Sequence, residues 1–61
     1  MKNYKLTYYG FYGFSYMTCD SEEECIGEAK QLAKVGCTPD RVMKYEAKTD
    51  TYKVIGNFTK K

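Results

Sequence analysis

Alternating apolar and polar positions predict four short strands, two on each side of a helical segment. Over residues 2–9 the side chains of Tyr4, Leu6 and Tyr8 recur at every second position. This is the period of a strand with one buried face. Three further apolar runs of strand length follow, at residues 13–19, 41–47 and 51–58.

The second run, residues 13–19, leaves open which of its two faces is buried. Successive side chains of a strand point to opposite faces, so the run divides into two sets. These are Phe14, Tyr16 and Thr18, or Ser15, Met17 and Cys19. We favour the first set as the inward one, because it buries more area.

Residues 20–36 carry the signals of a helix with defined ends. Ser21 and Glu24 have the spacing of a capping box, in which each side chain satisfies an orphan backbone donor. Gly36 is suited to end the helix in a left-handed conformation, and Pro39 prevents its continuation. Five small or apolar side chains recur at helical spacing: Cys25, Ile26, Ala29, Leu32 and Ala33. This narrow stripe fits one helix lying across a sheet.

The order of these elements predicts an α+β domain of the type β-β-α-β-β, with one helix packed across one face of a four-stranded sheet. Gly10 and Gly13 mark the first turn, and residues 48–51 supply the turn chemistry of the second. With 61 residues the chain is expected to form a single domain over residues 1–61, with residues 59–61 as a frayed tail.

Three features resemble the immunoglobulin-binding domains of streptococcal protein G. They are the segment YKL at residues 4–6, a single helix ending at a glycine, and the hairpin sequence YEAKTDTYKV at residues 45–54. The resemblance implies a β-grasp fold, in which the terminal strands pair in parallel at the centre of a mixed sheet. That family binds antibody Fc with the help of a Trp on the third strand. Met43 stands at that position here and the chain has no Trp, so only the fold is carried over.

Composition argues against catalysis and cofactor binding. The chain has no His, so the commonest general base near neutral pH is missing, and so is any Ser–His or Cys–His pair. The consecutive carboxylates of Glu22, Glu23 and Glu24 are explained by the start of the helix. We therefore expect a non-enzymatic protein with no cofactor and no small-molecule substrate.

The three cysteines, Cys19, Cys25 and Cys37, are expected to be free thiols in a reducing compartment, the cytoplasm. The N-terminal sequence MKNYKLTYYG is polar and has no signal-peptide character, and no apolar run reaches membrane-spanning length. With Asp20 the thiols offer four metal ligands, but they lack the Cys-x-x-Cys spacing of structural zinc sites. No metal site is predicted, and Cys37 is the thiol we expect to be most exposed.

The seven Tyr and three Phe residues suit both a core and an interaction surface. We expect a protein-binding module that acts as an inhibitor, adaptor or regulator, of a type found in phages or mobile elements. Its partner would be a larger protein or a second copy of the chain, and no membrane is involved. The predicted binding residues are Tyr9, Phe11, Tyr12, Met17 and Ile55, with Lys44 and Lys53 supplying orientation.

The alternative is single-stranded nucleic acid, because bases stack on aromatic side chains interleaved with lysines. The sheet face away from the helix would provide this surface. We expect that face to carry Lys5, Thr7, Tyr9, Phe11, Lys44, Lys53, Ile55 and Asn57. A net charge of +2 is a weak basic bias for such a role.

Overall fold

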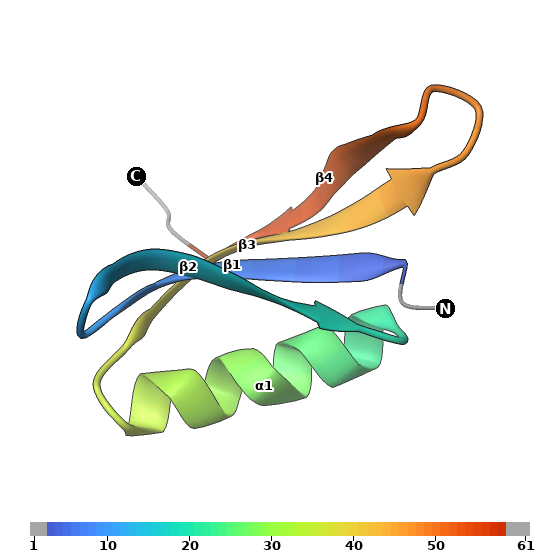
Figure 1. Ribbon diagram of the computed structural model, residues 1–61. Helices are drawn as coiled ribbons and strands as arrows, with labels where there is room; N and C mark the ends of the chain where they lie inside the picture. Colours follow the sequence, from blue (N-terminus) through green and yellow to red (C-terminus); the bar gives the residue numbers. More distant parts are fainter. Residues whose placement is uncertain (1–2, 59–61) are drawn as a thin grey trace.

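The computed structural model describes residues 3–58, and in this range one helix packs against one face of a four-stranded antiparallel sheet (Figure 1). The elements in chain order are β1 (Tyr4–Gly10), β2 (Gly13–Cys19), α1 (Glu22–Lys34), β3 (Thr38–Glu46) and β4 (Thr51–Asn57). The predicted α+β class and the helix on one face of a four-stranded sheet are confirmed. The predicted frayed tail at residues 59–61 lies outside the described residues.

The strand order in the sheet is β2-β1-β3-β4, and every neighbouring pair is antiparallel. The parallel pairing of the terminal strands that the resemblance to protein G implies is therefore wrong. β1 pairs with β3 instead, and β4 lies at the edge of the sheet. The register between β1 and β3 shifts at Thr7/Tyr8, where Asp40 is the extra residue of a bulge. The side chain of Thr7 bonds to Asp40 at this point, which ties β3 to β1.

The core lies between α1 and the sheet and is made of small or medium side chains. The fully buried apolar residues are Leu6, Cys19, Cys25, Ala29 and Val42, and the side chains of Tyr4, Met17 and Leu32 pack against them. As predicted, the set of β1 that includes Leu6 faces the helix. Cysteine and alanine on α1 let the helix approach the sheet closely, so this layer has little room for large rings.

The prediction that Phe14, Tyr16 and Thr18 of β2 face inward is wrong. Met17 is opposite Leu6 and Cys19 is opposite Tyr4 in the register, so Met17 and Cys19 share the face that α1 covers. Phe14 and Tyr16 point to the other side and are exposed. The set with the larger side chains is not the buried one, because the space beneath a helix lined by small side chains accommodates Met and Cys.

Both helix ends follow the sequence signals. The Ser21 hydroxyl accepts a hydrogen bond from the Glu24 N–H at 3.1 Å, and the Glu24 carboxylate accepts one from the Asp20 N–H at 2.8 Å. At the other end Gly36 has a φ of 99°, in the left-handed region. The Cys37 N–H donates to the Leu32 carbonyl and the Gly36 N–H to the Ala33 carbonyl, as in a Schellman motif.

The hairpin of β3 and β4 extends away from the helix, and α1 contacts β1, β2 and β3 but not β4 (Figure 1). Asp50 closes its turn with a φ of 55° and accepts a hydrogen bond from the Tyr45 hydroxyl. That bond favours the protonated phenol and raises the pKa of Tyr45 above its usual value. The distal part of this hairpin is therefore held by local contacts.

Candidate functional site

Large side chains concentrate on the sheet face opposite α1, which no other element covers within residues 3–58. We call this surface the open face. The register places the following residues on it: Lys5, Thr7, Tyr9, Phe14, Tyr16, Thr18, Arg41, Met43, Tyr45, Tyr52 and Val54. It thus draws aromatic rings from all four strands.

Two aromatic pairs on this face each span neighbouring strands. The rings of Tyr9 in β1 and Phe14 in β2 have centroids 5.0 Å apart and are tilted by 59°. The rings of Tyr45 in β3 and Tyr52 in β4 meet edge to face, with centroids 5.6 Å apart. Such tilted and edge-to-face arrangements are favourable for aromatic rings. They hold the rings in defined positions although the face is open to solvent.

Lys5 links the two sides of the open face. Its Nζ atom lies 4.7 Å from the ring centroid of Tyr16 in β2 and 4.1 Å from that of Tyr52 in β4. An ammonium group over an aromatic face is attracted by the ring quadrupole. The Lys5 charge is therefore engaged by two rings. Together the rings of the open face form a row across the sheet, which we call the aromatic row: Tyr9, Phe14, Tyr16, Tyr45 and Tyr52.

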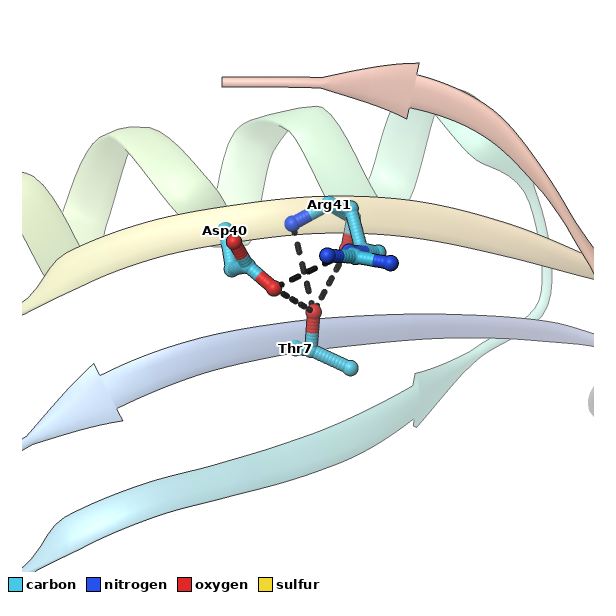
Figure 2. Close-up of polar contacts among 3 residues, drawn as sticks. All are labelled: Thr7, Asp40 and Arg41. Carbon is cyan, nitrogen blue, oxygen red and sulfur yellow. Dashed lines mark hydrogen bonds and ion pairs between the residues drawn. The ribbon is translucent and has the colours of Figure 1, made fainter. Parts of the chain in front are cut away.

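Beside this row, three residues form a polar cluster around the β3 bulge (Figure 2). The buried Asp40 carboxylate lies 3.1 Å from Arg41 Nε and 3.1 Å from the Thr7 hydroxyl. That hydroxyl also accepts a hydrogen bond from the Arg41 backbone N–H at 3.2 Å. The Arg41 carbonyl lies 3.2 Å from it as a second acceptor. The Arg41 charge is thus committed to Asp40, and the cluster fixes the bulge.

The turn between β1 and β2 carries Phe11 and Tyr12, which are both highly exposed. A methyl group at Gly36 would lie 3.6 Å from the Phe11 ring, so Phe11 lies over the loop that follows α1. A shallow groove of about 320 Å³ runs between this turn and the end of the helix. Its lining includes Tyr8, Phe14, Leu32 and Cys37 together with the turn.

The structure brings together only part of the predicted binding set. Tyr9 lies on the open face, with Phe11 and Tyr12 in the adjoining turn. Ile55 is exposed and lies in β4, the edge strand farthest from β2, where a register shift against β3 makes it the extra residue of a bulge.

Three predicted binding residues lie elsewhere. Met17 is half-buried against the core instead of joining an exposed cluster. Lys44 lies on the helix side of the sheet, with its Nζ atom 5.9 Å from the ring centroid of Tyr4. Lys53 is opposite Lys44 in the register and shares that side. The expectation that Lys44 and Lys53 belong to the open face is wrong, because their strand positions alternate with those of Tyr45 and Tyr52.

Four aromatic residues of the open face were not predicted from the sequence: Phe14, Tyr16, Tyr45 and Tyr52. A usable signal was present for the last two. Tyr45 and Tyr52 lie on either side of the predicted turn at residues 48–51, and the observed turn at residues 47–50 places them opposite each other in the hairpin. For Phe14 and Tyr16 the signal was ambiguous, because either face of β2 could have been the inward one.

The cysteine thiols lie apart from the open face. Cys19 and Cys25 are buried in the core and Cys37 is half-buried, and all three are free. Burial, and then the neighbouring Cys19, raise the pKa of Cys25 from 9.0 to about 12, so this thiol stays protonated near neutral pH. Within residues 3–58 no group of three His, Cys, Asp or Glu side chains is placed to hold a metal ion. α1 is too short and too polar to cross a membrane.

No protein-family model matches the chain, and no curated protein or solved structure shows significant similarity to it.

Proposed function

We propose that this chain is a non-enzymatic protein-binding module whose open face docks on a larger protein. The carrying observation is the uncovered row of aromatic rings, in which Tyr9, Phe14 and Tyr16 are 51%, 58% and 59% exposed. Contiguous exposed apolar surface on a small protein marks an interaction site. Tyr and Phe supply large contact areas at low cost in conformational entropy.

The distribution of charge favours a protein over single-stranded nucleic acid as the partner. Lys5 and Arg41 are the cations that the register places on the open face, and each is already engaged, by tyrosine rings or by Asp40. Lys44 and Lys53 lie on the opposite side of the sheet. A surface that tracks a phosphate backbone needs cations along its path. On the open face of residues 3–58, the two cations beside the rings are already engaged, so they are poorly placed to bind a phosphate backbone.

A cytoplasmic inhibitor, adaptor or regulator fits this surface. Two buried thiols and a half-buried third one suit a reducing compartment. The chain has no His to act as a general base, and the Cys25 thiol is held protonated in the core, so neither group supports a catalytic role. Occupation of a partner's surface requires none of these groups.

The proposal is tested by affinity capture from nuclease-treated lysate of the native cells, followed by titration of the captured protein. Wild type is compared with Tyr9→Ser and Tyr52→Ser on the open face. The matched control is Ile26→Ser, at an exposed apolar position on α1. We expect one protein at a fixed stoichiometry, at least about tenfold weaker binding by both open-face variants, and wild-type binding by the control.

Two results would overturn the proposal. One is equal binding by the open-face variants and wild type, which would place the contact elsewhere. The other is capture only without nuclease, with binding to single-stranded oligonucleotides that falls steeply as salt rises. That result would assign the open face to nucleic acid.

A further inference from the structure

The two edges of the sheet are built differently. β4 is interrupted by the bulge at Ile55 and carries Lys53, and bulges and lysines are devices that protect an edge from pairing. β2 has neither device. Its sequence, GFSYMTC, has no charge and no Pro, and its register with β1 is regular over all seven residues. The β2 edge is therefore open to another strand.

The backbone of β2 presents its hydrogen-bonding groups in a defined pattern. The Tyr45 N–H donates to the Asn3 carbonyl at 2.7 Å, so the odd-numbered residues of β1 direct their backbone groups toward β3. The even-numbered residues, such as Leu6, then bond to β2, at the partners Cys19, Met17 and Ser15. The remaining backbone groups of β2, those of Phe14, Tyr16 and Thr18, point away from the sheet.

We infer that the β2 edge pairs with the β2 edge of a second copy of this chain, in antiparallel orientation about a twofold axis at Tyr16. Tyr16 would exchange both backbone hydrogen bonds with its counterpart, and Phe14 would lie opposite Thr18 of the second copy. The result is one eight-stranded sheet. Because β2 is uncharged, this pairing places no like charges opposite each other.

The orientation of the helices adds no like-charge repulsion to the pairing. α1 runs antiparallel to β2, because Glu24 at its start bonds to Asp20 after β2, while Leu32 near its end lines the groove with the β1–β2 turn. A twofold axis at Tyr16 therefore sets the two helices antiparallel on the same side of the sheet. The acidic first turn of each, residues 22–24, then lies at the same end as the basic last turn of the other, which contains Lys34.

The arrangement also extends the open face. Both copies turn their aromatic rows to the same side of the joined sheet, with Phe14 and Tyr16 of each copy next to the axis. Self-pairing uses the backbone at the edge, whereas docking on a larger protein uses the rings of the face. The two proposals can therefore fail separately.

The test combines sedimentation velocity with amide hydrogen exchange on the wild-type chain, from micromolar to millimolar concentration and with reductant present. We expect a concentration-dependent dimer. Exchange at the amides of Phe14, Tyr16 and Thr18 should slow by about tenfold or more as the dimer forms. The amide of Tyr52, on the outer side of β4, should show no such change. A monomer at every concentration, with unchanged exchange at these amides, would overturn the inference.

Two substitutions make the test specific for the edge. Tyr16→Glu sets two carboxylates opposite each other at the axis and should weaken the dimer by at least about tenfold. Tyr52→Glu is the matched control, because it puts the same charge beside the same Lys5 but on the other edge. It should leave the dimer constant unchanged. Equal weakening by both variants, or slowed exchange at β2 only when a different protein is added, would contradict pairing with a second copy.

Discussion

The two faces of the sheet use opposite kinds of side chain. The face under α1 is closed by residues of modest size, with Leu6 and Val42 on the sheet against Cys25 and Ala29 on the helix. The open face holds most of the large rings of the strands, among them Phe14, which α1 does not cover, whereas Tyr4 packs against the core. Side chains of modest size thus form the centre of the core, while most of the strand rings remain in contact with water.

This difference indicates that folding and binding depend on separate residues. In a chain this small, only one layer can be buried between a single helix and the sheet. Rings left outside that layer contribute less to stability, because they keep much of their contact with water on folding. Substitutions on the covered face should therefore change stability, and substitutions of the exposed rings on the open face should change binding.

The largest expected effect is that of Leu6→Ala on the covered face. Leu6 is 0% exposed, and removal of its side chain should lower the free energy of unfolding by about 2–5 kcal/mol. Urea denaturation followed by circular dichroism measures this loss. The matched pair Val42→Ala and Val54→Ala makes the same truncation on the covered and the open face. A cost at Val54 equal to that at Val42 would contradict the separation.

The next effect concerns the polar cluster that holds the β3 bulge. Thr7→Val keeps the shape of the side chain but removes a hydrogen bond to the buried Asp40 and the acceptor of the Arg41 N–H. The free energy of unfolding should fall by about 1–3 kcal/mol. Thr18→Val, at an exposed position of the same face, is the control and should cost much less. Equal costs would show that the cluster contributes nothing specific.

Burial of the Cys25 thiol under α1 should make the free energy of unfolding depend on pH. The folded state raises the pKa of Cys25 from 9.0 to about 12, so above pH 9 the unfolded chain loses this proton while the folded chain keeps it. Stability should therefore fall as pH rises from about 9 to about 12, by at most about 1.4 kcal/mol per pH unit. Urea midpoints across this range test the slope. It should be shallower in Cys25→Ala and unchanged in Cys37→Ala; equal slopes in all three would contradict the assignment.

The smallest effect on stability is expected at the exposed turn. Tyr12 is fully exposed, so Tyr12→Ala should change the free energy of unfolding by less than about 0.5 kcal/mol. If Tyr12 extends the binding surface, the same variant should weaken binding to the captured partner by about 1–3 kcal/mol. Calorimetric titration beside thermal unfolding gives both numbers. A clear loss of stability would assign Tyr12 to the fold.

Sequence reasoning was reliable where local chemistry decides the structure. The capping box of Ser21 and Glu24 and the left-handed Gly36 could be predicted because each involves neighbours in the chain. The strand at residues 13–19 was also placed at its observed bounds.

What the sequence left undetermined depends on contacts between distant segments. The pairing of β1 with β3 is tied by Thr7 and Asp40, which lie far apart in the chain. The orientation of β2 depends on the space beneath α1, which no pattern within β2 reveals. The positions of Lys44 and Lys53 depend on the register of one hairpin, where a shift of one residue exchanges the faces.

The proposal with the widest consequences is that the open face, and not the helix, contacts the partner. Its most direct test is chemical-shift mapping of the isotopically labelled chain on addition of the captured protein. We expect the largest changes at Tyr9, Tyr16 and Tyr52, while the signals of Glu28 and Lys30 on α1 stay unchanged. Changes confined to α1, with the signals of the open face undisturbed, would contradict it.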